Sequence, residues 1–306
     1  MRWLRPTLLT VTVALVACSK VPERAARYAV SEQAFAGAAV PLAELPHRLC
    51  VRNAQYAYLS TLVEPLAPAA LPPWSEWYAK TDAGDGTWKA QCDGAEALGQ
   101  ALRGVLRALR LHAHALGALA ASRSFDTSGL QKLAAGAGTV TAMGGFKDAA
   151  AKITDAGNGL SSAAGVFLQW YRAGKLENAI AASDDGIARV AKDLREVVGV
   201  ARMEIETVQR KRRLVVGMMR AHEWKPADAP GHVIGQGFEL ATDFDTELAR
   251  EQTSLDRATA AIDALASGHH MLASLARGTT TPADVDATLD ALDGAVDDLL
   301  DEEWNR

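Results

Sequence analysis

The chain has 306 residues, a formal net charge of −5 at pH 7, 23% charged residues and 6% aromatic residues. A mildly acidic chain lacks the excess of lysine and arginine that neutralises phosphates, so general nucleic-acid binding is excluded. Alanine and leucine are abundant while aromatic residues are scarce, which favours helix over sheet. We therefore expect an all-α protein of one large or two small domains.

The first 19 residues have the layout of a secretory signal peptide. Arg2 and Arg5 precede a short apolar stretch, from about Thr7 to Ala17, that ends at Cys18. This stretch is too short to cross a bilayer, which takes roughly 20 apolar residues. The run Leu-Val-Ala-Cys at residues 15–18 resembles the lipobox of bacterial lipoproteins. An ordinary cleaved signal peptide is the alternative, although no Ala-x-Ala cleavage motif is present.

The lipobox resemblance covers residues 1–19 only, and it implies a lipid anchor. Removal of the signal peptide, residues 1–17, would leave Cys18 as the N-terminus, carrying a diacylglyceryl group and an N-acyl chain such as palmitate. Stable anchoring takes more than one acyl chain, and the diacylglyceryl group together with the N-acyl chain meets this requirement. Loss of two arginines would move the formal charge from −5 to −7.

Ser19 follows the lipobox cysteine. Many Gram-negative lipoproteins that stay in the inner membrane have an aspartate there. The resemblance therefore implies the outer membrane, facing the periplasm, if the organism is Gram-negative. We expect a cell-envelope protein that is attached to its membrane through Cys18.

Two further cysteines, Cys50 and Cys92, form an even pair in a chain with an export signal. Such a pair suggests a disulfide. Closing the loop between them would stabilise the fold by ~4 kcal/mol in the chain-entropy model. The alternative is two unrelated buried thiols, and neither cysteine lies in a nucleophile motif.

The chain after the signal peptide divides into a tether with a short lead-in helix (residues 18–40) and an α-helical bundle (residues 41–306). A helix from about Leu45 to Leu66 opens the bundle. A Pro/Trp-rich loop follows at residues 72–88, with at most one short helix. Four aromatic residues of this loop form either an exposed patch that binds a protein partner or a small core beneath the loop: Trp74, Trp77, Tyr78 and Trp88.

Apolar residues spaced by three and four predict the remaining helices. We expect a helix from about Ala90 to Ser122, then broken helices over residues 129–168 with bends near 144–145 and 157–159, where glycines cluster. A long helix from about Leu176 to His222 carries a heptad seam, and further seams follow over residues 244–272 and 285–299. The sequence thus predicts an elongated antiparallel bundle of long helices.

Motifs for catalysis, metals or cofactors are absent from the sequence. His112 and His114 lie two apart, so a helix directs them to different faces, and His112 falls on an apolar stripe typical of a core histidine. His269 and His270 are adjacent and diverge. No Gly-x-Ser-x-Gly turn or phosphate loop is present. We expect neither a metal nor a cofactor.

Two charge clusters stand out in the second half of the chain. Residues 210–213 read Arg-Lys-Arg-Arg, and residues 284–303 contain nine acidic residues and no basic one. Each is interpreted as a solvated face, while contact of the basic run with anionic lipid or with the acidic helix is the alternative. Arg212 differs from its neighbours because it falls in the apolar seam.

Together these features favour a non-catalytic envelope lipoprotein, a helical scaffold or adaptor that binds a protein partner. A membrane-active protein resembling helical pore-forming toxins is one alternative, although charged residues such as Lys147 and Asp155 interrupt its apolar middle. An enzyme whose site is assembled from distant residues is the other.

Overall fold

The computed structural model describes residues 20–63, 72–84, 86–124, 126–128, 131, 147–173, 175–221 and 231–300. For residues 147–149, 160, 219–221 and 231–247 it describes the helical backbone alone. The lipobox-like run that ends at Cys18, on which the expected lipid anchor depends, lies outside the described residues. The helices are α2 (Val21–Ala38), α3 (Leu45–Val63), α4 (Trp74–Lys80), α5 (Trp88–Ala120), α7 (Lys147–Arg172), α8 (Leu176–Ala221), α9 (Gly231–Ala276) and α10 (Pro282–Leu300), with a 3-10 turn, η1 (Val40–Ala43).

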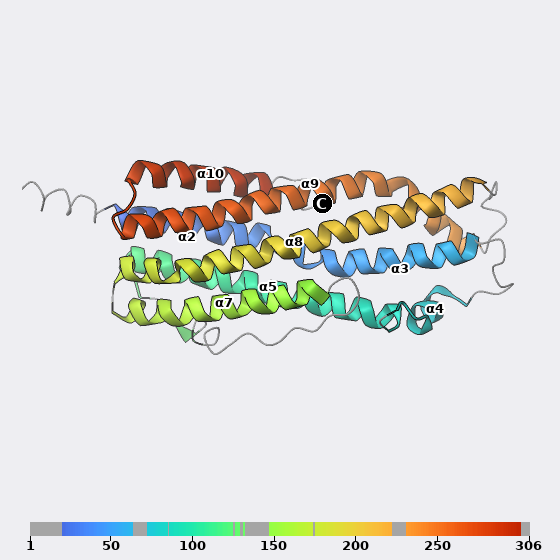
Figure 1. Cartoon of the computed structure of the whole chain (residues 1–306), viewed down its shortest axis with the longest axis horizontal. Coiled ribbons are helices and arrows are strands. Elements are labelled where there is room, and N and C mark those ends of the chain that lie inside the picture. The colour runs from blue at the N-terminus through green and yellow to red at the C-terminus, as the bar shows by residue number, and fades with distance from the viewer. Residues whose placement is uncertain are drawn as a thin grey trace, which may run out of the picture.

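The helices pack lengthwise into an elongated bundle, which confirms the predicted all-α fold (Figure 1). The antiparallel pair α8 and α9 runs the full length of the molecule, and each has 46 residues, about 70 Å at 1.5 Å per residue. Helices α2 and α3 follow one another in one direction, joined by η1, and α5 returns alongside them. As a result, α2 begins at one end of the long axis and α4 lies toward the other (Figure 1).

Side-chain caps define the starts of two helices. At α5, the Thr87 hydroxyl accepts a hydrogen bond from the backbone N–H of Ala90 at 3.3 Å. At α10, Thr281 and Asp284 bond each other's backbone N–H groups, both at 3.3 Å. This reciprocal arrangement is a capping box with aspartate in the place of glutamate. The hydrogen bonds that Asp284 accepts from Thr281 also lower the pKa of Asp284.

The seams that the sequence predicted form one continuous core. In α8 the buried seam residues are Ile187, Ala191, Leu194, Val198, Ala201, Ile205, Val208 and Val215, and in α9 they are Leu248, Leu255, Ala258, Ile262, Leu265, His269 and Leu272. The stripe of α10 is buried as well. Because these helices are apolar on one side only, each buries its stripe against its neighbours.

Helix α7 is continuous where the sequence predicted a bend near residues 157–159, so that prediction was wrong. The reason is helix packing. A Cβ atom at Gly159 would lie 3.5 Å from Val190 of α8, and one at Gly186 would lie 2.5 Å from the Cβ of Ala163. Small residues let α7 and α8 approach closely, and this packing offsets the cost of about 1 kcal/mol per helical glycine. The bend expected near residues 144–145 lies outside the described residues.

Helix α2 is part of the bundle core rather than a separate lead-in segment. Tyr28 and Phe35 of α2 are fully buried and belong to the same cluster as the seams of α8 and α9. The division expected at residue 40 therefore does not separate a tether from the bundle.

Candidate functional site

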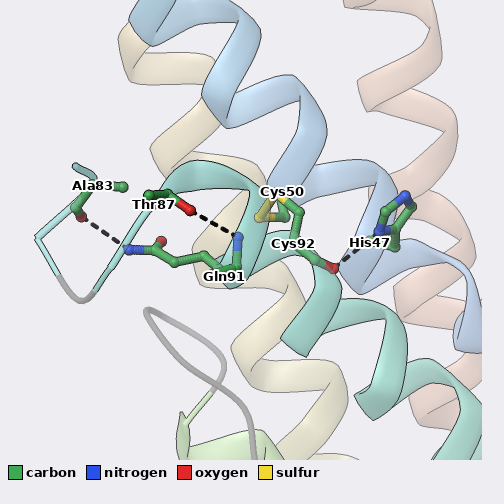
Figure 2. Close-up of a disulfide and its surroundings, with 7 residues drawn as sticks. His47, Cys50, Ala83, Thr87, Gln91 and Cys92 are labelled. Carbon is green, nitrogen blue, oxygen red and sulfur yellow. Dashed lines mark hydrogen bonds between the residues drawn. A yellow bond between two sulfur atoms is a disulfide. The ribbon is translucent and has the colours of Figure 1, made fainter. Parts of the chain in front are cut away.

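A disulfide joins α3 to α5 (Figure 2), in the half of the molecule that holds α4 (Figure 1). It links Cys50 and Cys92, the pair offered by the sequence, with their Cα atoms 5.4 Å apart. One turn before Cys50, the Nδ1 atom of His47 lies 3.1 Å from the backbone oxygen of Cys92. The disulfide thus closes the base of the segment that includes α4.

A tight turn connects α4 to α5. Gly84 and Gly86 have φ angles of +100° and +109°, in the region that favours glycine. The Asp82 carboxylate accepts the backbone N–H of Gly84 at 2.9 Å, and the Gln91 side chain donates to the backbone oxygen of Ala83 at 3.0 Å (Figure 2). The turn is therefore fastened to the first residues of α5.

The aromatic residues of this end form a stack, which we call the aromatic tip: Tyr58, Trp74, Trp77, Tyr78 and Trp88. Ring centroids lie 5.1 Å apart for Trp74 and Tyr78, 5.8 Å for Trp74 and Trp77, and 6.3 Å for Trp77 and Trp88. Tyr58 meets Trp74 and Trp77 edge-on at 5.5 and 5.2 Å. Aromatic pairs at these separations are attractive beyond their burial of apolar area.

The aromatic tip combines a small core with a surface. Trp77 and Trp88 are buried, and with Ala54 and Tyr58 they form a cluster separate from the main core. This agrees with the interpretation of a small core beneath the loop. Trp74 and Tyr78 are only partly buried, so these two rings present the accessible face of the stack.

One residue of the basic run contacts the aromatic tip. The ammonium of Lys211 lies 5.2 Å from the centroid of the Trp88 ring, within the range of a cation–π interaction. Burial lowers the pKa of Lys211 and raises the pKa of nearby Glu204. This contact joins the C-terminal part of α8 to the start of α5.

The acidic helix α10 pairs with α2 rather than with the basic run in the interactions described. Arg24 bonds Asp286, and Arg27 bonds Asp290 and Asp293. The side-chain hydrogen bonds to Asp290 and Asp293 raise the pKa of Arg27. This row of ion pairs holds the last helix against the first part of the described chain.

A second polar cluster lies inside the core, in the half of the molecule that holds α2. Nδ1 of His112 in α5 lies 3.0 Å from each carboxylate oxygen of Glu32 in α2. Both side chains are buried, and Nε2 of His112 has no hydrogen-bond partner among the described residues. His112 is therefore a core histidine, as its place on the apolar stripe indicated.

Asp184 of α8 and His269 of α9 form a second histidine–carboxylate pair, next to His112 and Glu32. The Asp184 carboxylate lies 3.3 Å from Nδ1 of His269, 3.1 Å from Nδ1 of His270 and 3.2 Å from Nη1 of Arg277. Burial by itself would raise the pKa of Asp184, but the hydrogen bonds from His269 and His270 outweigh it and lower that pKa to about 2. Burial lowers the pKa of His269.

The two histidine–carboxylate pairs are in contact. The rings of His112 and His269 have centroids 5.8 Å apart, and Tyr28 meets His269 edge-on at 5.4 Å. No sequence motif marks Glu32 or Asp184, and neither was predicted. The available signal was an acidic residue on an apolar stripe, because Glu32 lies one turn after the buried Tyr28 and Asp184 lies one turn after the buried Ile180.

Three residues of this cluster follow the atom order of a Ser–His–Asp nucleophile. Ser183 Oγ lies 3.3 Å from Nε2 of His269, whose Nδ1 faces Asp184. Acyl transfer also requires room for a substrate carbonyl beside the hydroxyl. Ser183 and His269 are 0% exposed, and the Ser183 hydroxyl lies 2.9 Å from the carbonyl oxygen of Ala179 in its own helix. In this packing the three residues connect α8 to α9.

Cavities and metal-ligand clusters add little to these features. An apolar cavity of about 20 Å³ lies between α2, α5, α8 and α9, with Phe35, Leu102 and Leu194 in its lining. It is about the size of one water molecule and offers no polar group to bind one. In the part of the chain that the structure describes, no three His, Cys, Asp or Glu side chains converge as metal ligands. Within the same residues, every helix is too short or too polar for a membrane span.

Comparisons of the chain with protein-family models, curated proteins and solved structures find no match. In the part of the chain that the structure describes, the aromatic tip is a fixed arrangement of rings that is partly accessible. The sequence also predicts that this segment binds a protein partner.

Proposed function

We propose that the protein is a lipid-anchored scaffold of the bacterial cell envelope that binds a protein partner through its aromatic tip. The observation that carries this proposal is the position of the two ends. Helix α2 begins at Val21, three residues after the lipobox cysteine Cys18, and the aromatic tip lies toward the opposite end of the long axis (Figure 1). A lipid at Cys18 would therefore hold the start of α2 at the membrane and place the aromatic tip away from the membrane.

The bundle between the two ends suits a rigid spacer. Helix α8 spans it without interruption, and its seam is buried against α9 and α7. Ion pairs join α2 to α10 at the end near residue 20. The Cys50–Cys92 disulfide joins α3 to α5, the helices that carry Tyr58 and Trp88 of the aromatic tip. A spacer of this kind sets the height of a contact above the membrane at about 70 Å.

The accessible face of the tip has the composition of a protein-binding site. Trp74 and Tyr78 stack within one short helix, and the Trp74 ring also stacks on the buried Trp77. Aromatic residues are enriched among the side chains that dominate binding energy, and fixed rings lose little entropy on binding. Glu76 and Lys80, which are paired with each other at 2.8 Å, supply a polar edge.

Site-specific photocrosslinking in the native envelope tests the partner surface. A photoreactive residue at Ser75, which is exposed in α4, is compared with one at Thr279, which is exposed at the other end of the molecule. The proposal expects a discrete protein adduct from position 75 and none of the same mass from position 279. Equal adducts at both positions would count against a tip-specific partner.

A matched pair of variants tests whether the aromatic face makes that contact. The double change Trp74→Ala and Tyr78→Ala is expected to abolish the adduct at position 75. Val30→Ala is the control, because it removes an apolar side chain that is 69% exposed on α2. An adduct that survives the double change, in protein whose circular dichroism is unaltered, would refute the tip as the binding site.

A further inference from the structure

Three neighbouring helices form an outer surface of the bundle, with α2 in the middle and α10 and α5 on its two sides (Figure 1). We call this surface the three-helix face. Helix α10 runs alongside α2 in the same direction, because Arg24 bonds Asp286 and Ser31, two turns later, bonds Asp293. The 18 residues of α2 give the face a length of about 27 Å.

Helix α5 runs in the opposite direction on the other side of α2. A Cβ atom at Gly117 of α5 would lie 3.5 Å from the Cβ atom of Ala29, near the middle of α2. One at Gly37, near the end of α2, would lie 3.1 Å from the Nη2 atom of Arg110. The Arg110 guanidinium is therefore next to α2, at the height of Gly37.

The two flanks of the three-helix face carry opposite charges. Arg107 and Arg110 are three residues apart on α5, so they share one side of that helix, and both are exposed. On α10, Asp290 bonds Arg27 of α2, and Asp297 follows two turns later on the same side. Among the described residues, Arg107, Arg110 and Asp297 have no ion pair. One flank thus offers free cations and the other a free anion.

The middle of the three-helix face is small and mainly apolar. Val30 of α2 is 69% exposed. Ala26 lies one turn before it and Gly37 two turns after it, and both are partly exposed. Gln33 is the exposed polar residue of this line. An apolar centre between charged edges is the usual anatomy of a protein–protein interface.

We infer that the three-helix face binds a second copy of this chain in a parallel dimer, with α2 against α2. A half-turn about an axis parallel to α2 exchanges the flanks, so that α10 of each copy lies over α5 of the other. The acidic flank then meets the basic flank twice. An axis across the helices would instead place α10 on α10 and α5 on α5, where like charges repel.

The heights of the charged residues agree with this pairing. Ser31 bonds Asp293, so Asp297, one turn later, lies at about the height of Phe35. Arg110 lies at the height of Gly37. A two-fold axis parallel to α2 leaves heights unchanged, and it therefore places Asp297 of one copy opposite Arg110 of the other. With about 20 Å between its outer helix axes, the face has the size of a small interface.

The dimer goes beyond the proposed function, because it depends on the three-helix face and on neither the aromatic tip nor Cys18. It is compatible with a lipid anchor. In a parallel dimer both α2 helices begin at the same end, so both chains would be anchored in one membrane.

Sedimentation of the lipid-free chain, residues 18–306 with Cys18→Ser, tests the dimer. We expect a dimer whose dissociation constant rises with salt, because salt screens exposed ion pairs. Arg110→Asp should raise that constant about tenfold or more, since two pairs become repulsive. Adding Asp297→Arg to the same chain should restore most of the affinity. Arg213→Asp, which changes an exposed arginine of α8, should leave the constant unchanged.

A cysteine near the two-fold axis tests the orientation. In the same chain Val30→Cys introduces the only free thiol, since Cys50 and Cys92 are bonded to each other. In the parallel dimer Val30 meets Val30 of the second copy, so mild oxidation should link two chains. Leu214→Cys, at an apolar position of α8 that is 60% exposed, should not link them.

Three results would overturn the parallel dimer. They are sedimentation as a monomer at every concentration tested, equal linking through positions 30 and 214, and a charge-reversed double variant that dimerises no better than Arg110→Asp alone.

Discussion

A Cβ atom placed on Gly99 of α5 would lie 2.0 Å from the backbone oxygen of Ala43 in η1. Helix α5 thus passes the junction of α2 and α3 at direct backbone contact. The 3-10 turn between α2 and α3 therefore fits at this place only against a residue without a side chain.

Gly99→Ala should therefore destabilise the protein, although alanine favours helix. Overpacking against backbone costs about 1–3 kcal/mol or more, which outweighs a propensity gain of about 1 kcal/mol. Gly104→Ala is the control on the same helix, since a Cβ atom at that position would have nothing within 4 Å, and it should be neutral or stabilising. Urea denaturation measures both, and equal midpoints for the two variants would contradict the contact.

Loss of the disulfide should lower stability without changing the fold. Cys50 and Cys92 are 42 residues apart in sequence, and the chain-entropy model gives a loss of about 4 kcal/mol when such a loop is opened. The Cys50→Ser, Cys92→Ser double variant is compared with the unaltered protein by denaturation under oxidising conditions. Indistinguishable midpoints would mean that the loop is ordered without the bond.

Two tryptophans of the aromatic tip should differ in their effect on stability. Trp77 is 6% exposed and contacts three other rings, so Trp77→Ala should cost about 3–5 kcal/mol. Trp74→Ala removes a partly exposed ring and should cost clearly less. Thermal unfolding monitored by near-UV circular dichroism separates them. The reverse order would show that the tip is packed differently.

Asp184 should support stability in acid as well as at neutral pH. Its pKa in the folded chain is about 2, below the ordinary value of 3.8. The stabilisation is therefore fully present above about pH 3.8, and it is lost as pH falls toward 2. Asp184→Asn should flatten the pH dependence of unfolding between pH 4 and 2. An unchanged slope in that variant would show that Asp184 has an ordinary pKa.

Periodicity was sufficient to predict the long helices. The seam from Ile187 to Val215 and the stripe from Val285 to Leu299 are buried, because a stripe of apolar residues specifies which side of a helix must leave water. Periodicity failed at Gly157 and Gly159, where helix propensity predicted a break. There the decisive factor is the close approach of α8, a tertiary contact that a one-dimensional pattern does not contain.

The polar interior was the least predictable part of the molecule. The position of His112 on an apolar stripe places it in the core, but its partner Glu32 is 80 residues earlier in the chain. No local signal pairs residues at such a distance. The same holds for the cation above the aromatic tip, since Lys211 belongs to a basic run typical of a solvated face, and only the path of α8 brings it over Trp88.

Energy transfer from the lipidated protein to a membrane dye tests most directly the claim that one end is anchored and the other presented. The protein is inserted into liposomes whose headgroups carry an acceptor, with a donor at Thr279 or at Ser75. Thr279 lies close to the start of α2, since Arg24 donates to the backbone oxygen of Pro282 at 3.2 Å. We predict strong transfer from position 279, weak transfer from position 75, and none from either position after Cys18→Ala. Equal transfer from both positions, or transfer that survives Cys18→Ala, would contradict the account.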